Sequence, residues 1–326
     1  MRLLVTDIGG TNARVALCQD TTIYLLKIYP TRYFGSAIEL FSHFQKDTNQ
    51  KLPPYWAVAA AGVTSDEKIE GTNLKWDISK RELIEAFNLR SCILLNDFEA
   101  AAYGLSVVDE KRLLKLAGET PQPKETKILI GAGTGLGEAT CVYCKGLGWK
   151  ALRSEGGHAT FAPTDETEME LAIYLKAKYR HVSYERILSG LGLLELYGFF
   201  MKKDSHKDMF EETFKSPSQV TEAAEKGDKP SIKAIKLFCK IYGEEAGNFA
   251  LKTLPLGGVF ITGGVSLHIV SWLQKGWFQE GFVQKGRMTN LLKNIPVFLV
   301  KEPYLGIYGG AYRLLQTCMT KATTAS

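Results

Sequence analysis

The sequence has no apolar run of about 18 residues, the length at which a helix can cross a membrane. Its first residues, Met1-Arg2 and a short apolar segment, lack the pattern of a signal peptide. The charge is nearly balanced, because 40 basic and 35 acidic residues give a net charge of +5 and form no long basic run. A nucleic-acid footprint needs a denser basic patch. We therefore expect a cytoplasmic protein that binds neither membranes nor nucleic acids.

Cysteine is sparse, with 6 scattered among 326 residues. This pattern is typical of reduced, buried thiols in a cytosolic protein and provides no disulfide framework. One C-x-x-C pair, Cys141 and Cys144, leaves two alternatives: a redox or zinc site, or two core thiols on a strand. We favour the core thiols, because no second Cys or His pair follows that could complete a metal site.

The two common nucleotide-binding motifs are missing as well. There is no G-x-x-x-x-G-K-[S/T] segment, which excludes a P-loop protein. The glycines between residues 131 and 137 have the wrong spacing for G-x-G-x-x-G, and a strand rather than a helix is predicted after them. A dinucleotide-binding fold is therefore not indicated.

The chain does have ample material for a core, since 45% of its residues are apolar and 23% are charged. Its length exceeds that of one compact domain and predicts two α/β lobes. Strands and helices alternate up to a polar, proline-containing stretch at residues 107–123, and the alternation then restarts. We predict a small lobe of residues 1–108 and 304–326 and a large lobe of residues 109–303.

Hydrophobic periodicity gives the individual elements. Strands are predicted at residues 3–6, 13–18, 23–29, 56–61, 91–95, 127–130, 138–143, 259–262 and 297–300. Helices are predicted at residues 34–45, 98–105, 168–179, 191–202, 219–225, 231–251 and 309–319. A further helix is predicted to begin at Ser79, where Glu82 completes the pattern of a capping box.

Glycines follow three of the predicted strands: Gly9-Gly10, the run from 131 to 137, and Gly263-Gly264. Glycine lets the backbone approach a ligand closely, and successive amides in such turns bind anions. A tight hairpin without a ligand is the alternative for each turn. Because three such turns occur, we predict phosphate binding. The residues concerned are Gly9, Gly10, Thr11, Asn12, Gly133, Thr134, Gly135, Gly263 and Gly264.

The first two turns also resemble each other. When Gly10-Thr11 is aligned with Gly133-Thr134, the apolar strands on both sides match, which indicates a duplicated strand–glycine turn–strand unit. Asp7 has no counterpart, because Ile130 stands at its position in the second copy. A carboxylate beside phosphates is useful if it holds Mg²⁺, directly or through water. We therefore predict Asp7 as the partner of a magnesium ion.

Polar residues also stand at the ends of other predicted elements, where they can form hydrogen bonds with a ligand. Asn96 and Asp97 end a predicted strand, an edge where ligands of α/β proteins bind. Glu155, His158 and Glu185 are further candidates. Each has an alternative: Asn96 or Asp97 can cap a helix, His158 can be structural, and Glu185 can lie on a solvated face. Glu155 and His158 can also be a metal pair, although no third ligand is near.

The segment from Asp7 to Arg14 resembles the first phosphate segment of the bacterial glucokinase family, within the sugar kinase, heat-shock protein 70 and actin superfamily. Five more segments are similar to that family in the same order, and they span nearly the whole chain. They are residues 95–100 (LNDFEA), 131–137 (GAGTGLG), 155–158 (EGGH), 185–190 (ERILSG) and 258–264 (GVFITGG).

The resemblance implies a two-lobed, actin-like (ribonuclease H-like) α/β fold with a cleft that closes on the sugar. It implies ATP-dependent, Mg²⁺-dependent phosphorylation of glucose at the 6-hydroxyl, as in glycolysis, by a homodimer. Asp97 would be the general base, and Asn96, Asp97, Glu155, His158 and Glu185 would bind the sugar. Thr72, Asn73 and Trp76 are weaker candidates. The alternatives are a kinase for another hexose or hexosamine and a non-catalytic sugar sensor.

Overall fold

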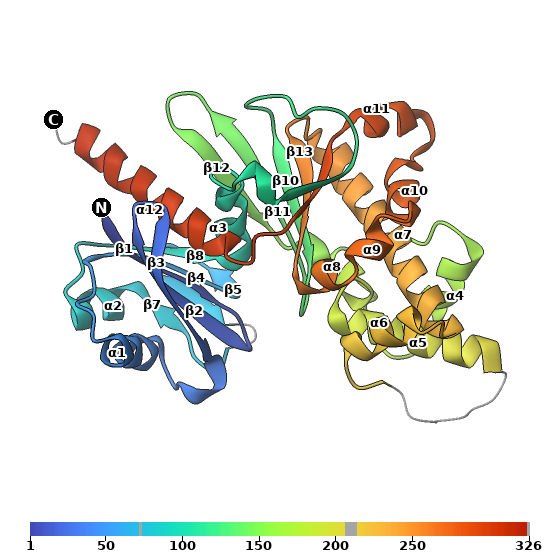
Figure 1. Cartoon of the computed structure of the whole chain (residues 1–326), viewed down its shortest axis with the longest axis horizontal. Coiled ribbons are helices and arrows are strands. Elements are labelled where there is room, and N and C mark those ends of the chain that lie inside the picture. The colour runs from blue at the N-terminus through green and yellow to red at the C-terminus, as the bar shows by residue number, and fades with distance from the viewer. Residues whose placement is uncertain (72–73, 206–213, 325–326) are drawn as a thin grey trace. The chain divides into compact units, whose positions relative to one another are not determined.

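The computed structural model describes residues 1–71, 74–205 and 214–324, which form two compact units (Figure 1). The first unit comprises Met1–Glu110, Cys141–Arg153 and Glu302–Ser326, and the second comprises Lys111–Thr140 and Ser154–Lys301. The predicted small lobe did not include Cys141–Arg153, which belongs to the first unit. The chain therefore passes between the two units four times, rather than twice as predicted.

The first unit is built on a five-stranded sheet with the strand order β3-β2-β1-β4-β8. β1 (Arg2–Ile8), β2 (Asn12–Gln19) and β3 (Thr22–Pro30) are antiparallel neighbours. β4 (Tyr55–Ala60) pairs parallel with β1, and β8 (Ser91–Asn96) pairs parallel with β4. A three-stranded antiparallel sheet adds β5 (Gly62–Thr64), β6 (Lys68–Gly71) and β7 (Ile78–Ser79).

Helices cover both faces of the five-stranded sheet, because its central strands are apolar on both sides. Leu4 belongs to a core shared with α1 (Ala37–Thr48) and α2 (Lys80–Phe87). Leu3, which points to the other face, belongs to a core shared with α12 (Leu305–Thr324). α3 (Asp97–Gly104) packs against α12 (Figure 1).

The six-stranded sheet has the order β12-β11-β10-β13-β14-β9. Its first five strands repeat the order of the first sheet, so the predicted duplication is confirmed. The strands are β9 (Leu113–Ala117), β10 (Lys127–Ala132), β11 (Leu136–Cys144), β12 (Gly148–Ser154), β13 (Gly258–Thr262) and β14 (Val297–Val300). β10, β13 and β14 are parallel, and β9 is an antiparallel edge strand.

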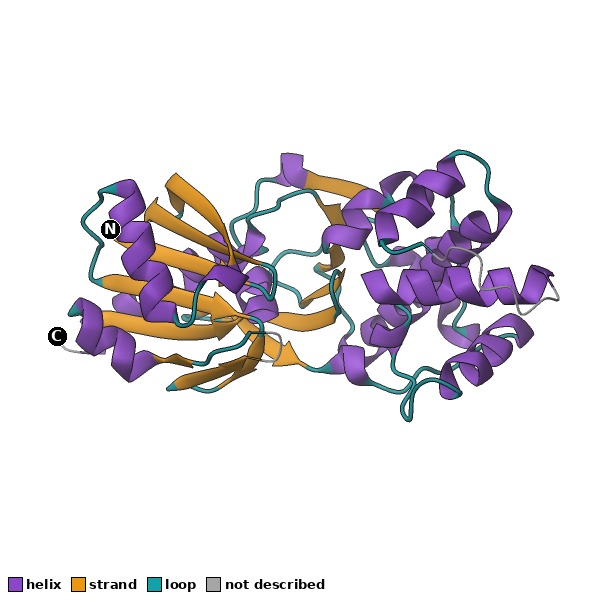
Figure 2. Cartoon of the chain, turned by 90° about the horizontal axis from the view of Figure 1, so that it is seen from below, coloured by secondary structure: helices purple, strands orange, loops and turns teal. Residues whose placement is uncertain are grey.

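Helices make up most of the second unit (Figure 2). They are α4 (Glu166–Lys176), α5 (Gly190–Ser205), α6 (Pro217–Glu225), α7 (Lys229–Thr253), α8 (Gly264–His268), α9 (Val270–Leu273), α10 (Trp277–Val283) and α11 (Thr289–Asn294). Short 3-10 helices occur at η1 (Thr31–Tyr33), η2 (Glu110–Arg112), η3 (Gly156–His158), η4 (Tyr184–Arg186) and η5 (Gly286–Met288).

The long helix α7 is fixed to the end of the second sheet by one buried side chain. The Tyr242 hydroxyl accepts a hydrogen bond from the Ala132 amide at 3.2 Å and lies 3.1 Å from the Ile130 carbonyl. It is also 3.2 Å from the Ser266 hydroxyl at the start of α8. The backbone beside the second and third glycine turns is therefore held by the same tyrosine.

The predicted strands and helices are largely present, with shifted ends. α3 begins at Asp97 rather than residue 98, and α12 begins at Leu305 rather than 309. Strands β5, β6, β7, β9 and β12 were not predicted, and each of them has at most one buried residue. Among the residues described, no helix has the length and apolarity needed to cross a bilayer.

Candidate active site

The first glycine turn joins β1 to β2 and is fixed by its own backbone and by Thr31. The Gly9 amide donates to the Asn12 carbonyl at 2.9 Å, which closes the turn. The Thr31 amide donates to the Thr11 carbonyl at 3.0 Å, and its hydroxyl donates to the Gly9 carbonyl at 2.9 Å. Gly10, Thr11 and Asn12 are exposed. The carbonyl groups of the turn thus accept hydrogen bonds from within the protein, while the tip of the turn is accessible to solvent.

Asp7 lies at the end of β1, directly opposite Arg14 of β2. The Arg14 guanidinium contacts the Asp7 carboxylate at 2.7 Å. Burial raises the pKa of Asp7, and the charge and hydrogen bond of Arg14 oppose that rise. Arg14 was not predicted as part of the site, although the register of a short hairpin places the two residues across from each other.

The donor set at Asp7 fits a magnesium ion that is held mainly by phosphate oxygens and water. In the described part of the chain, no group of three His, Cys, Asp or Glu side chains could hold a metal. Mg²⁺ in phosphoryl-transfer sites needs only one or two carboxylates, since the nucleotide supplies further oxygens. One oxygen of Asp7 is paired with Arg14, which leaves the other for a water-bridged contact.

Asn96 and Asp97 lie at the same edge of the first sheet as the glycine turn. In the parallel pairing of the strands, Ile8 of β1 lies opposite Ala60 of β4, and Ala60 lies opposite Asn96 of β8. The Asn96 carboxamide oxygen accepts from the Phe98 amide at 2.9 Å and the Glu99 amide at 3.2 Å. The capping role considered for Asn96 is therefore present, and it fixes Asp97 in the first turn of α3.

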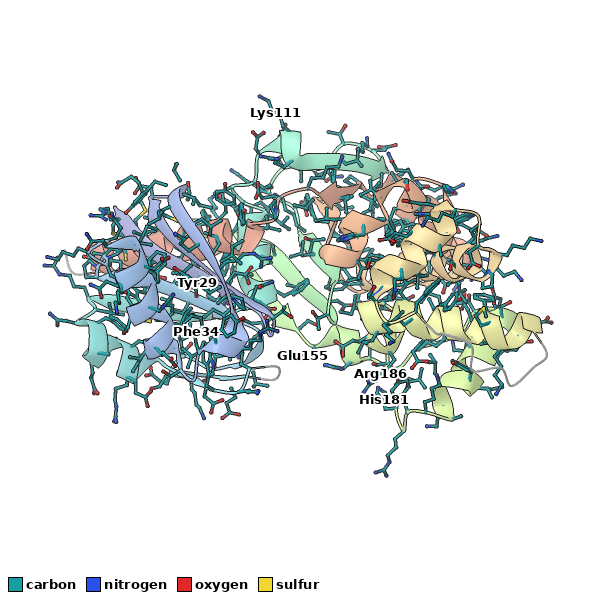
Figure 3. All side chains as sticks on the ribbon, turned by 60° about the horizontal axis from the view of Figure 1, so that its bottom comes forward. Tyr29, Phe34, Lys111, Glu155, His181 and Arg186 are labelled. Atoms are coloured by element: carbon teal, nitrogen blue, oxygen red, sulfur yellow. The ribbon has the colours of Figure 1, made fainter. Side chains whose placement is uncertain are left out.

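The weaker candidates near the first sheet are less informative. Thr72 and Asn73 lie outside the described residues. Trp76 is buried, and its indole donates to the Phe34 carbonyl at 2.9 Å. The Phe34 ring meets Tyr29 edge-on at 6.0 Å between ring centroids (Figure 3). Trp76 thus has a packing role, and the structure gives no support for a sugar contact.

The second and third glycine turns come together at one edge of the second sheet. β10 and β13 are parallel neighbours, so Gly133 and Gly264 follow adjacent strand ends. A Cβ built on Gly133 would lie 4.0 Å from the Gly264 amide nitrogen. The Gly190 amide, at the start of α5, donates to the Gly133 carbonyl at 2.9 Å. Thr134 is exposed.

Packing does not require glycine at Gly9, Gly133 or Gly264. None of these has a positive φ. A Cβ on Gly9 would lie 3.6 Å from the Asn12 carbonyl oxygen, and one on Gly133 would lie 4.0 Å from the Gly264 nitrogen. A Cβ on Gly264 would have no atom within 4 Å. Gly263 differs, because its φ is +97° and a Cβ would overlap the Ala132 carbonyl. The fold therefore leaves room at these three positions for a ligand to approach the backbone.

Glu155, His158 and Glu185 meet within the second unit. The His158 ring lies 3.9 Å from the Glu155 carboxylate and 3.8 Å from the Glu185 carboxylate. Glu185 also accepts a hydrogen bond from the Leu136 amide at 3.1 Å. A Cβ on Gly135 would overlap the Glu185 carboxylate, so the glycine leaves room for Glu185 in the position that it takes here. Among the described residues, no group of three His, Cys, Asp or Glu side chains, this one included, could hold a metal ion.

The segments that carry these three side chains are held side by side. Thr160 and Ser183 form an isolated antiparallel bridge. The Tyr184 amide donates to the Ala159 carbonyl at 3.1 Å, which brings η3 and η4 together. His181 contacts the His158 carbonyl at 2.9 Å. Glu155, His181 and Arg186 are labelled in this region in Figure 3.

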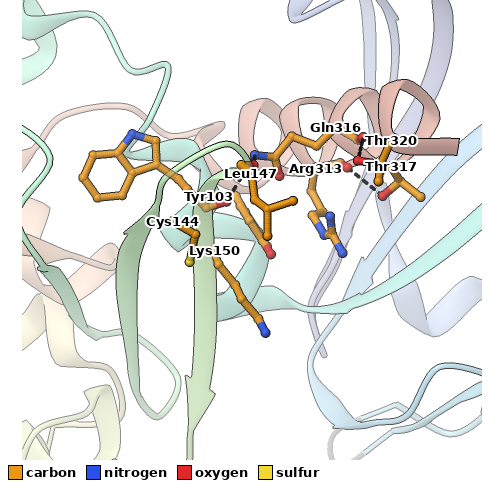
Figure 4. A pocket seen from close by; sticks show the side chains of 9 residues that line it. Tyr103, Cys144, Leu147, Lys150, Arg313, Gln316, Thr317 and Thr320 are labelled. Carbon is orange, nitrogen blue, oxygen red and sulfur yellow. Dashed lines mark hydrogen bonds between the residues drawn. The ribbon is translucent and has the colours of Figure 1, made fainter. Parts of the chain in front are cut away.

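Two other features lie apart from the predicted site residues. All six cysteines are free, and Cys141 is buried on β11, which agrees with core thiols. A cavity of about 340 Å³ in the first unit is lined by side chains that include Tyr103, Lys150, Arg313 and Gln316 (Figure 4). No predicted site residue lines this cavity.

Two sheets of the same strand order, each ending in glycine turns and polar side chains, define the actin-like class of phosphoryl-transfer folds. A sequence model of the glucokinase family matches residues 4–317. The chain therefore belongs to the glucokinase family.

Individual relatives agree with this assignment. The chain is 35% identical to a glucokinase of Chromohalobacter salexigens over 95% of its own length and 97% of the relative. A crystal structure of a glucokinase from an Antarctic psychrotroph superposes with a TM-score of 0.84 at 30% identity, covering 96% and 98% of the two chains. A glucokinase of Balamuthia mandrillaris in complex with glucose has a TM-score of 0.82 at 21% identity, covering 95% and 92%. The predicted actin-like fold is thus confirmed.

Proposed function

We propose that this protein transfers the γ-phosphoryl group of ATP to the 6-hydroxyl of glucose. The observation that carries the proposal is the set of open glycines, Gly9, Gly133 and Gly264, at strand ends that also position polar side chains. The tips of the first two turns, Gly10 to Asn12 and Thr134, are exposed, and such turns suit phosphate groups. The family membership supplies the reaction, and the Balamuthia relative is described in complex with glucose.

Asp97 is the proposed general base. It would accept the proton of the 6-hydroxyl as that oxygen attacks the γ-phosphorus and the bond to the β-phosphate oxygen breaks. Phosphoryl transfer asks for in-line positioning and charge neutralisation, and a carboxylate beside the nucleophile completes it. The cap that Asn96 provides keeps Asp97 in the first turn of α3, which limits the positions that its carboxylate can take.

The sugar hydroxyls are assigned to Glu155, His158 and Glu185, together with the side-chain nitrogen of Asn96. Carboxylates accept from hydroxyls, and an imidazole can donate or accept. Asp7 would hold a Mg²⁺ ion through water, and the ion would supply positive charge beside the phosphates. Arg14 orients Asp7 for this role, since it fixes one of the two carboxylate oxygens at 2.7 Å.

The Asp97→Asn variant tests the proposed base. Asparagine keeps the size of the side chain but cannot accept the proton, so we expect kcat with glucose and ATP to fall about 10²–10⁴-fold. Coupled ADP-release kinetics measure this fall, and the glucose KM should change much less. Asp66→Asn, at an exposed carboxylate of the same unit, is the control. Full turnover in Asp97→Asn would refute the assignment of the base.

Three further properties are proposed with the reaction. Glucose is proposed as the preferred acceptor, and the same assay with mannose, fructose and an N-acetylated hexosamine tests that choice. A cytoplasmic location is proposed, and the six free thiols support a reducing compartment. A homodimer is proposed from the family resemblance alone, and sedimentation equilibrium tests it.

A further inference from the structure

Two buried carboxyl groups of the second unit carry a feature that the proposed reaction does not use. Glu138 on β11 is 3% exposed, and Glu245 on α7 is 1% exposed. The Oε1 atom of each is buried without a hydrogen-bond partner. None of the ion pairs found among the described residues includes either carboxylate. Neither acid therefore has a neutralising cation in contact, and the Glu138 side chain is hydrogen-bonded to that of Glu245.

Two negative charges in such a buried pair would cost a large electrostatic free energy. Burial, and then the charge of Glu245, raise the pKa of Glu138 to about 8. Burial also raises the pKa of Glu245. The other titratable groups that act on the pair are Lys252, Lys285, Glu244, Tyr184 and Tyr242. The two lysines oppose the rise from a distance, but burial is the larger effect for both acids.

The pair contacts both segments that carry the proposed sugar ligands. A Cβ on Gly156 would overlap Oε2 of Glu138, so the backbone between Glu155 and His158 lies directly on this carboxyl group. On the other side, the Asn248 side chain donates to Glu245 at 3.0 Å and to the Tyr184 hydroxyl at 3.0 Å. Tyr184 immediately precedes Glu185.

We propose that Glu138 and Glu245 share one proton and act as positioning residues for the two sugar-binding segments, η3 and η4. This inference rests on the proposed function, because it assigns the support of the same sugar site. With one proton, the pair forms a carboxyl–carboxylate hydrogen bond behind Gly156. Loss of that proton places two like charges in a buried site, and their repulsion displaces the backbone that lies on Glu138.

The consequence for glucose binding has a definite direction. If only the protonated pair binds the sugar well, the wild-type Kd for glucose rises about tenfold between pH 7 and pH 9. Calorimetric titration with glucose in the absence of ATP measures this rise. In Glu138→Gln the side chain keeps its shape and stays neutral, so the affinity at pH 7 is retained and the rise is lost. A rise of the same size in the variant would overturn the proposal.

A matched control is available one residue from Glu245. Glu244 is equally buried on α7, but Lys240 contacts it at 2.7 Å. Glu244→Gln therefore removes a buried carboxylate without touching the shared proton, and the wild-type rise in Kd should persist. Loss of the rise in this control as well would mean that any carboxylate in this region sets the pH dependence, and the pair would then have no special role.

The shared proton can also be tested without any sugar. At a pH below its unfolded-state pKa, a carboxyl group whose folded-state pKa is raised is neutral in both the folded and the unfolded protein. It therefore does not lower the free energy of unfolding at that pH. As the pH rises towards 8, the unfolded state ionises while the folded state does not, and stability is lost. Thermal unfolding should therefore show the Glu138→Gln variant gaining stability over wild type from pH 5 to pH 8. A pH-independent difference would refute the shared proton, whereas a failure of glucose to bind at any pH would refute only the proposed function.

Discussion

Replacement of Gly264 by alanine should have opposite effects on the stability of the protein and on its binding of ATP. The position begins α8, and a Cβ there would meet no atom within 4 Å. Alanine at such a site reduces the entropy of the unfolded chain and stabilises the fold by roughly 0.4–1 kcal/mol. For a chain of this length the melting temperature should then rise by about 1 °C. Packing alone thus predicts a harmless, slightly favourable change.

Function should change in the opposite direction. If the Gly264 backbone donates to a phosphate oxygen, the new methyl group keeps the phosphate away and removes a charge-assisted hydrogen bond of about 1.5–3 kcal/mol. The KM for ATP should rise at least about tenfold, because about 1.4 kcal/mol corresponds to a factor of ten. The KM for glucose should stay the same, since Gly264 is not among the proposed sugar ligands. Steady-state kinetics and differential scanning calorimetry on one preparation give both quantities.

Gly35→Ala is the matched control for this experiment. Gly35 also lacks a positive φ, and its Cβ would meet only the flexible Glu39 carboxylate at 3.4 Å. We expect a similarly small change in melting temperature and no change in either KM. A Gly264→Ala enzyme with a higher melting temperature and an unchanged KM for ATP would show that this turn does not approach the nucleotide.

Two further predictions concern stability. Gly309→Ala should destabilise the protein by about 1–3 kcal/mol, because the Cβ would overlap the Ala100 carbonyl where α12 crosses α3; urea unfolding measures the loss. Lys240→Met should cost about 3–5 kcal/mol, because Glu168 and Glu244 are left buried without their cation. That loss should shrink as the pH falls, because burial raises the pKa of Glu244 and protonation removes its unpaired charge. A pH-independent loss in thermal unfolding would refute this explanation.

The sequence predicted much of the fold because alternation and glycine turns are local signals. The strands around Gly9-Gly10 and around Gly133-Thr134 follow from apolar segments that flank a turn, and their common strand order follows from the duplication. The strands that were not predicted bury few side chains: β6 (Lys68–Gly71) and β12 (Gly148–Ser154) each have a single buried residue. Strands of this kind are recognised only through their neighbours in a sheet.

Only some residues of the candidate site and its surroundings could be identified from the sequence. Asn96 and Asp97 were identified because they end one element and begin the next, which is visible in the sequence. Glu138 and Glu245 were not identified, because one follows a glycine turn and the other lies in the middle of a long helix. Their meeting depends on how α7 packs on the second sheet, and no local pattern carries that information.

The return of α12 to the first unit has a consequence for the order in which the protein folds. α12 covers the face of the first sheet to which Leu3, Val5 and Ala57 belong, yet it is the last helix along the chain. As the chain leaves the ribosome, that apolar face stays uncovered until nearly all of the second unit has been synthesised. The second unit has all of its strands and helices earlier and can fold first. The half of the protein that is made first is therefore completed last, and premature termination before α12 would expose a sheet face that is prone to aggregation.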